Sequence, residues 1–302
     1  MTYSEFIDKI TKDLQTDFGT ILPERYRKAE IGSREVQKLQ GRSYLGLTFR
    51  PEGAATEASL DLKPLYESFK NGRPYSALLK ELEQELLKLA NRMPSPDPEL
   101  FSNYDKLKHH LMIQMIPRKG NEKMLEDLPH RDLEDLCAVY RFDLCCLGCP
   151  DSSILITRSM LEDYGITPEQ LHSDALQYAP LLHPASFRKL HDIIKENGGA
   201  DIPEDADAPA IFVATVENGF SGAGVLLYPG FLDYAAGRLK GRFFILPSSI
   251  HELLFIEDND DIRPEFLKEM VRSINEAHVA PEDRLSNCVY HYTSGSGLPE
   301  AV

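Results

Sequence analysis

The stretch RFFILPSSIHELLFI, Arg242–Ile256, places two strongly apolar runs on either side of the polar segment Pro-Ser-Ser-Ile-His-Glu. Each run has the length of a strand and nearly continuous apolar character, which predicts strands covered on both faces. Pro247, Ser248 and Ser249 form a turn-like segment between the runs. The stretch therefore predicts two buried strands joined by a polar turn.

Apolar runs continue before and after this stretch. The segments AIFVATV (210–216), GVLLY (224–228) and NCVYHYT (287–293) are predicted as further strands. A short helix is expected at 229–241, and a longer amphipathic helix is expected at 263–279. This half of the chain is thus predicted to be rich in strands, with helices that cover them.

The region from 111 to 179 predicts a second group of elements. LMIQMIP (111–117) has the character of a strand, and 136–157 is typical of two strands around a Gly-Pro-Asp turn. Two helices are expected at 158–179, the second of which begins after Thr167. The acidic segment 196–209 is predicted to be a loop. Together these elements favour an α+β (mixed α/β) fold, with a mainly antiparallel sheet and flanking helices.

The N-terminal part of the chain is predicted to form a small subdomain of its own. A helix is expected at 3–18, short strands are expected between 29 and 62, and the clearest apolar stripe lies on a helix at 74–92. Three prolines in NRMPSPDPEL (91–100) break that helix and are typical of a linker. We therefore expect an α+β subdomain at 1–95, a main α+β domain at 96–293 and a flexible tail at 294–302.

Composition limits the classes of function. The 302 residues include 33 Lys and Arg against 48 Asp and Glu, a formal net charge of −15 that disfavours binding to nucleic acid or to an anionic membrane. No window approaches the roughly 18 consecutive apolar residues of a membrane span. The N-terminus lacks the apolar core of a signal peptide, and five cysteines without a disulfide framework suit a reducing compartment. A cytoplasmic protein is expected.

Several segments together are similar to a known family. PHRDLEDLCAVYR, GITPEQLHSDAL, VLLYPGFLDYAAGRLKGRFFILPSSIHELLF and NEAHVAPEDRLSNCVYHY resemble, in sequence and in order, an uncharacterised bacterial family named domain of unknown function 5688. The similarity covers most of the chain and is densest from Pro129 to Tyr292. The resemblance implies no reaction, cofactor or catalytic residue, so the candidate sites depend on chemistry alone.

The segment SSIHE is the first candidate site. His251 is a possible general base or metal ligand, with Ser248 or Ser249 as nucleophile and Glu252 as the neighbouring carboxylate. Neighbours in a regular strand point to opposite faces, so His251 and Glu252 converge only within a turn or bulge. The alternative, which we favour, is a polar turn whose hydroxyls and imidazole satisfy loose backbone groups.

A second candidate lies in PHRDLEDLC. This segment is similar to the kinase catalytic loop, but Cys137 replaces the Asn that binds magnesium, and no Asp-Phe-Gly motif follows. A kinase is therefore not expected. His130 and Arg131 remain candidates for binding a phosphate or carboxylate. The simpler interpretation is that Asp132 caps a helix or pairs with Arg131 or Arg141.

Two further motifs have structural explanations, and one further residue is a candidate for ligand binding. CCLGC lacks the second cysteine pair of a zinc site, and NGFSGAG (218–224), placed between two predicted strands, is interpreted as a hairpin turn. Asn275, one turn before His278 near a helix end, is a candidate for ligand binding if the fold brings it near His251. No motif predicts a metal ion or another cofactor.

Two functions of different classes follow. The first is a soluble accessory protein that binds a protein partner without catalysis, and this is the one we favour, because every candidate site lacks its motif context. The alternative is a hydrolase-like enzyme with a site around His251 and Glu252, assembled by the fold rather than by a local motif.

Overall fold

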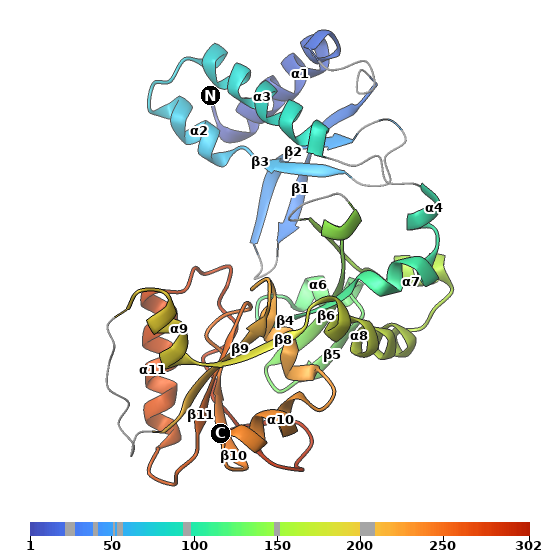
Figure 1. The fold of residues 1–302 in the computed structure, drawn as a ribbon. Coiled ribbons are helices and arrows are strands. Elements are labelled where there is room, and N and C mark those ends of the chain that lie inside the picture. Colours follow the sequence, from blue (N-terminus) through green and yellow to red (C-terminus); the bar gives the residue numbers. More distant parts are fainter. Residues whose placement is uncertain are drawn as a thin grey trace. The chain divides into compact units, whose positions relative to one another are not determined.

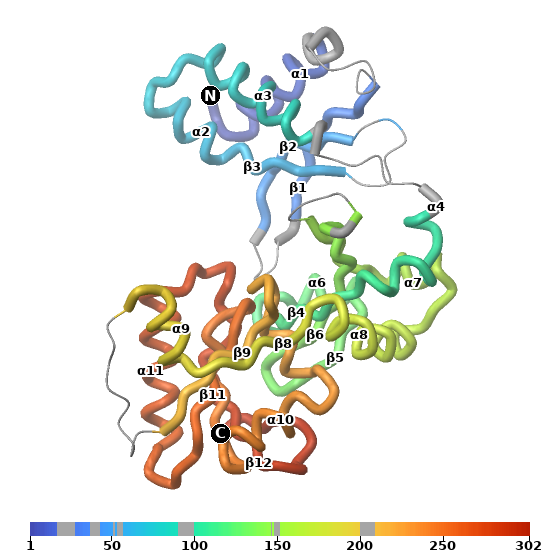
Figure 2. The backbone as a smooth tube through the Cα atoms, viewed as in Figure 1, coloured from blue at the N-terminus to red at the C-terminus, as the bar shows by residue number. Residues whose placement is uncertain are grey.

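The computed structural model of the protein describes residues 1–21, 28–38, 42–50, 52, 57–92, 98–147, 152–199 and 209–302 (Figures 1 and 2). These residues divide into two compact units, Met1–Tyr104 with Leu144–Ser153, and Asp105–Asp143 with Ile154–Val302. The predicted boundary at residues 95–96 and most of the predicted acidic loop 196–209 lie outside the described residues. The fold is α+β, as the sequence predicts.

The first unit packs helices on a three-stranded antiparallel sheet. Its elements are α1 (Tyr3–Ile21), β1 (Glu30–Lys38), β2 (Arg42–Arg50), β3 (Ala58–Asp61), α2 (Lys63–Lys70), α3 (Tyr75–Arg92) and α4 (Pro98–Phe101), with the strands in the order β1-β2-β3. Phe6 and Ile10 of α1, Leu82 of α3 and Phe49 of β2 belong to one core. The apolar stripes of α1 and α3 are therefore buried where the helical spacing predicts them.

The second unit contains a small sheet in the order β4-β6-β5, and β7 also pairs with β6. Its strands and helices are α5 (Tyr104–Leu107), a 3-10 helix η2 (Lys108–His110), β4 (Leu111–Pro117), α6 (Glu122–Asp127), β5 (His130–Leu133), β6 (Leu136–Asp143), β7 (Ser153–Leu155), α7 (Arg158–Tyr164) and α8 (Pro168–Leu182). A short 3-10 helix, η3 (Cys145–Leu147), lies in the segment Leu144–Ser153, which belongs to the first unit. The Thr167 hydroxyl accepts the N–H of Gln170 and so caps α8, as predicted.

The larger sheet of the second unit has the order β13-β12-β10-β11-β9-β8. Its strands are β8 (Ala185–Lys189), β9 (Ile211–Val216), β10 (Arg242–Leu246), β11 (Leu253–Glu257), β12 (Tyr290–Thr293) and β13 (Glu300–Ala301), with α9 (Leu190–Glu196) after β8. All five neighbouring pairs are antiparallel; for example, Phe244 lies opposite Ile256. Residues expected to form a flexible tail thus include a short strand that pairs with β12.

Helices cover both faces of this sheet, as the continuous apolar runs predict (Figure 1). On one face, α11 (Pro264–Ala277) packs Leu267 and Val271 against Phe244 of β10. On the other face, Phe231 of α10 (Phe231–Arg238) contacts Phe255 of β11, with ring centroids 5.9 Å apart. Alternate strand residues therefore face two different cores.

The prediction of a strand at 224–228 is wrong. Residues Gly222–Leu227 form a buried 3-10 helix, η4, so NGFSGAG joins β9 to a helix and is not a hairpin turn. The glycines are required by close packing: a Cβ at Gly222 would lie 2.3 Å from the carbonyl oxygen of His251, and one at Gly224 would lie 2.3 Å from that of Ile113. The apolar side chains are buried, as in a strand, but they lie on a helix.

Strands β5 and β8 were not predicted. Each carries a single buried residue, Leu133 in β5 and Phe187 in β8, so neither shows an apolar run.

Within the part of the chain that the structure describes, no helix has both the length and the apolar character of a membrane span.

Candidate functional site

The predicted site lies in the loop between β10 and β11. The loop is a polar hairpin connection, in which the N–H of Ser248 donates to the Leu246 carbonyl at 3.0 Å and the N–H of Ser249 donates to the Glu252 carbonyl at 3.2 Å. The N–H of His251 donates to the Ser249 hydroxyl at 3.0 Å. The Ser249 side chain is therefore engaged with the backbone of its own loop.

His251 connects this loop to two other segments. Its Nδ1 accepts the backbone N–H of Ser221 at 3.2 Å, and its Nε2 lies 3.4 Å from Oδ1 of Asp283. Its carbonyl oxygen accepts the hydroxyl of Thr215 at 2.7 Å. Since Nδ1 accepts a hydrogen bond, the proton of the neutral ring is on Nε2, facing Asp283. The imidazole is 33% exposed, with the ring of Phe220 centred 5.7 Å away.

Ser221 is held in an unusual conformation immediately before η4. Its φ of +55° is in the left-handed region, which few residues other than glycine adopt. The residue is 2% exposed, and its hydroxyl has no hydrogen-bond partner among the described residues. The next turn is fixed by Ala223, whose N–H donates to the Ile250 carbonyl, while the N–H of Ile250 donates to the Asp283 carbonyl at 2.8 Å.

The arrangement differs from the predicted pair of His251 and Glu252. Glu252 is exposed, and the imidazole of His251 pairs with Asp283 instead. Sequence reasoning missed Ser221 and Asp283, because both lie about thirty residues from His251 and only the fold brings them to it. The geometry joins a serine, a histidine and an aspartate, but the serine contributes its backbone N–H rather than its hydroxyl.

His130 and Arg131 do not form one anion site. They are neighbours on β5, where successive side chains point to opposite faces. Nε2 of His130 lies 3.8 Å from Oδ1 of Asp132, whereas Arg131 lies 3.6 Å from Oε1 of Glu169. Arg118 also pairs with Asp132, and its hydrogen bond holds the pKa of that carboxyl below its usual value. Each of the two side chains thus has a carboxylate neighbour within the protein.

Asn275 belongs to a separate buried network. Its Nδ2 donates to the Ser286 carbonyl and to Oδ1 of Asn287, both at 2.8 Å. The hydroxyl of Ser286 in turn donates to Asp135 at 2.6 Å, and the hydroxyl of Tyr290 donates to the same carboxylate. These contacts connect the end of α11 to the turn between β5 and β6, so Asn275 holds two parts of the unit together.

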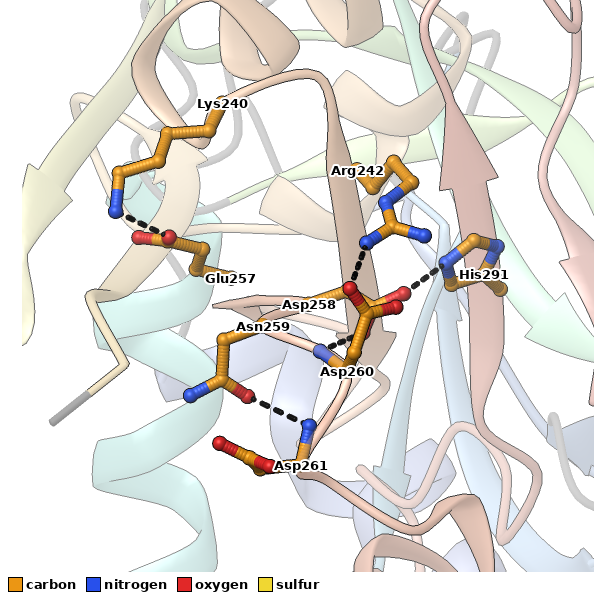
Figure 3. A network of polar contacts seen from close by, with 8 residues as sticks. All are labelled: Lys240, Arg242, Glu257, Asp258, Asn259, Asp260, Asp261 and His291. Atoms are coloured by element: carbon orange, nitrogen blue, oxygen red, sulfur yellow. Dashed lines mark hydrogen bonds and ion pairs between the residues drawn. The ribbon is translucent and has the colours of Figure 1, made fainter.

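Two aspartates of the acidic segment after β11 contact basic side chains (Figure 3). Oδ2 of Asp258 lies 2.9 Å from Nε2 of His291 on β12, and Asp260 pairs with Arg242 of β10 at 2.8 Å. Burial acts to raise the pKa of Asp258, but hydrogen bonds from the Asp260 N–H and from His291 lower it overall. Lys240 pairs with Glu257 at 2.6 Å. These polar contacts connect the segment after β11 to β10 and to β12.

The environment of the buried Cys137 does not favour a reactive thiol. Burial, with a hydrogen bond from the thiol to Asp132, raises the pKa of Cys137 to about 12. A thiol with that pKa is almost entirely protonated at neutral pH and is a poor nucleophile. Cys149 of the CCLGC motif lies outside the described residues. No group of three or more His, Cys, Asp or Glu side chains among the described residues is placed to hold a metal ion.

A buried pair of one histidine and one aspartate is another feature that the sequence did not indicate. Nε2 of His183 lies 2.9 Å from Oδ2 of Asp143, and the two side chains are 10% and 8% exposed. Nδ1 of His183 lies 3.2 Å from Nδ2 of Asn218, and the hydroxyl of Tyr228 donates to the His183 carbonyl at 3.1 Å. The pair connects the end of β6 to the segment between α8 and β8.

Comparison with known proteins assigns the chain to a family whose function is unknown. A family model described as Family of unknown function (DUF5688) matches residues 3–294, and it confirms the predicted resemblance. No curated protein and no solved structure matches the chain. Function therefore has to be inferred from the geometry.

Proposed function

Since the chain belongs to DUF5688, a family of unknown function, we propose from its geometry that it is a non-catalytic accessory protein that binds a protein partner. The supporting observation is an open apolar groove on the larger sheet, of about 580 Å³, beside α11. It is lined by Ile211 and Ile256 of the sheet and by Phe266, Leu267 and Met270 of α11. Phe266 is a large apolar residue next to the buried Leu267 of α11, yet it is 65% exposed.

The chemistry of the groove defines the partner. Its apolar floor suits a protein side chain such as leucine or phenylalanine, and Asp261 and Arg263 at its rim offer one charge of each sign. The formal charge of −15 disfavours nucleic acid and anionic membranes as partners. We place the protein in the cytoplasm of a bacterial cell, in keeping with its cysteine usage.

The hydrogen bonds already made by His251 and Ser249 support a role without catalysis. A general base needs a free lone pair within reach of the proton that it removes. In His251, Nδ1 already accepts the N–H of Ser221, and Nε2 faces Asp283. The Ser249 hydroxyl accepts the N–H of His251. These contacts hold the loop in place and leave no ring nitrogen of His251 bonded to a serine hydroxyl.

Photo-crosslinking tests the binding role. Benzoylphenylalanine is placed at Phe266 and, as a matched exposed control, at Glu252, and the protein is irradiated in its native cells. We expect an adduct of fixed mass at Phe266 that the Glu252 variant does not form. The partner is then identified and purified, and Phe266→Asp should weaken its binding at least about tenfold. Equal binding by wild type and Phe266→Asp would contradict the proposal.

A hydrolase with a site at His251 is the second candidate, and the unpartnered hydroxyl of Ser221 is the observation that favours it. In that enzyme, a rotation of Ser221 would bring its Oγ to Nδ1 of His251, and Asp283 would stabilise the protonated ring. A fluorophosphonate probe distinguishes the candidates: Oγ would attack phosphorus, fluoride would leave, and the hydroxyl proton would pass to Nδ1. Labelling of wild type that Ser221→Ala abolishes would establish the hydrolase; we expect no labelling.

A further inference from the structure

We propose that the protein carries a site of spontaneous covalent modification at Asn71, whose side-chain amide is lost as ammonia through a cyclic imide. Three asparagines of the chain precede a glycine, and they are Asn71, Asn197 and Asn218. Asparagine is a thermolabile residue, and a glycine after it leaves the attacking backbone nitrogen unhindered, since glycine has no Cβ. The three pairs are alike in sequence, but their side chains are held differently in the structure. This chemistry is independent of the proposed binding role.

The reaction needs only water and hydroxide. The N–H of the glycine gives its proton to hydroxide, and the nitrogen attacks Cγ of the asparagine. A C–N bond forms, the bond from Cγ to the amide nitrogen breaks, and ammonia leaves with a proton taken from water, which restores the hydroxide. Water then opens the imide at either carbonyl, giving aspartate or isoaspartate, and no electrons are transferred. The asparagine side chain has to turn toward the next nitrogen, so any hydrogen bond that it makes has to break first.

Asn71 directly follows α2, and no contact holds its side chain. The residue is exposed, and its amide makes no hydrogen bond within the described part of the chain. Its φ and ψ are −80° and 11°, and Gly72 has a left-handed φ of +91°. The N–H of Gly72 donates to the Phe69 carbonyl at 3.0 Å, at the end of a short helix that contains no buried residue. Such an end opens at low cost, which frees the attacking nitrogen.

Asn197 provides a comparison within the same molecule. It follows α9 with φ and ψ of −83° and 14°, Gly198 has a φ of +78°, and the N–H of Gly198 donates to the Lys195 carbonyl at 3.2 Å. The backbone geometry is thus nearly that of Asn71, and α9 also contains no buried residue. The difference is in the side chain, because Nδ2 of Asn197 donates to the Ile193 carbonyl at 3.0 Å. That bond has to break before Cγ approaches the Gly198 nitrogen.

Asn218 is held by two side-chain hydrogen bonds. Its Nδ2 donates to Nδ1 of His183 at 3.2 Å, and its Oδ1 accepts the N–H of Phe220 at 3.0 Å. The N–H of Gly219 donates to the carbonyl of Val216, the buried last residue of β9, at 2.9 Å. A turn anchored to a buried strand opens less readily than a helix end. Both the side chain and the attacking nitrogen are therefore restrained at this third pair.

Deamidation at Asn71 changes the turn that ends α2. The N–H of Arg73 donates to the Ser68 carbonyl at 3.1 Å and closes the helix. Isoaspartate inserts a methylene into the main chain within the segment that this bond spans, and the new carboxylate lies at a helix end where the dipole favours cations. The modified form should therefore have a less stable α2, and its added negative charge should separate it from the unmodified protein on anion exchange.

The experiment incubates the full-length protein at mildly alkaline pH and follows each asparagine by tandem mass spectrometry after digestion at acidic pH. Short synthetic peptides, one around each Asn-Gly pair, give the rate without structure, and the peptide rate divided by the protein rate is the protection of that site. Each side-chain hydrogen bond should add about two- to tenfold protection, the Boltzmann factor of its net contribution. We therefore expect protection about two- to tenfold greater at Asn197, and about four- to hundredfold greater at Asn218, than at Asn71.

Two controls separate structure from sequence. In concentrated urea the differences in protection should disappear, and Asn71→Gln, whose longer side chain closes a larger ring less readily, should remove the first acidic species seen on anion exchange. Protection at Asn71 equal to or greater than that at Asn197 would overturn the inference, as would an order that persists in urea or an early acidic species that Asn71→Gln still forms. None of these results bears on the Phe266 crosslink, which tests the binding role.

Discussion

Replacing Gly224 by alanine tests whether close packing of η4 against β4 positions the Ser221 turn. The added methyl group would lie 2.3 Å from the carbonyl oxygen of Ile113 and 3.1 Å from its carbonyl carbon. Both are backbone atoms of a buried strand, so no side-chain rotation relieves the contact. The 3-10 helix or the strand has to move by about 1 Å to reach ordinary van der Waals separation.

The expected cost is at the upper end of the range for overpacked cores, about 3 kcal/mol. For a unit of this size, that corresponds to a fall in Tm of about 6–12 °C. Gly237 provides the matched control, because it is exposed on α10 and has no atom within 4 Å of an added Cβ. Alanine is a better helix former than glycine, so Gly237→Ala should stabilise the protein by up to about 1 kcal/mol.

The assay is calorimetry and urea unfolding of wild type, Gly224→Ala and Gly237→Ala, with far-ultraviolet circular dichroism as the signal. The unit containing residues 105–143 and 154–302 should show the change in its transition, because both glycines belong to it. A Gly224→Ala protein as stable as wild type, or shifts of the same sign and size for the two variants, would refute the packing argument.

Three further outcomes are expected. Burial lowers the pKa of His110 and His172, so the unfolded chain binds more protons as pH falls from about 7.5 to 5.5 and the free energy of unfolding decreases; urea titrations should show a smaller decrease for His172→Gln. Iodoacetamide at pH 8 should alkylate the exposed Cys145 before the buried Cys137, as followed by mass spectrometry. Thr167→Ala should lower the free energy of unfolding by about 1 kcal/mol, because α8 loses its cap.

The parts of the fold that the sequence predicts are those in which one local pattern has one interpretation. The stripe of α3 repeats at helical spacing over 18 residues, and the two runs of Arg242–Ile256 are too short for helices and too apolar for loops. The prediction of a strand at GVLLY was wrong because a buried 3-10 helix and a buried strand can have the same apolar run. Strand β8 was missed because it buries only one side chain, that of Phe187, and so shows no apolar run.

The sequence predicts the polar turn that carries His251, but it does not predict the contacts of that histidine. The position of His251 in a polar turn follows from the two strands that flank it, since only a turn joins them over six residues. Its contacts depend on where β9 and the segment after α11 pack, and that arrangement depends on long-range packing rather than on the local pattern. No sequence motif and no adjacent apolar residue distinguishes Asp283 from other surface aspartates. Its contact with His251 is therefore visible only in the tertiary structure.

The polar segment between two apolar strands is explained by backbone hydrogen bonding. A buried hairpin and the left-handed turn beside it leave N–H and C=O groups that water does not reach, and each needs a partner. Ser249 accepts the N–H of His251, the His251 ring accepts the N–H of Ser221, and Thr215 donates to the His251 carbonyl. A ring nitrogen that holds a backbone N–H acts as a base only by releasing it, which would leave a buried donor unpaired. The same contacts that stabilise this turn therefore oppose catalysis by His251.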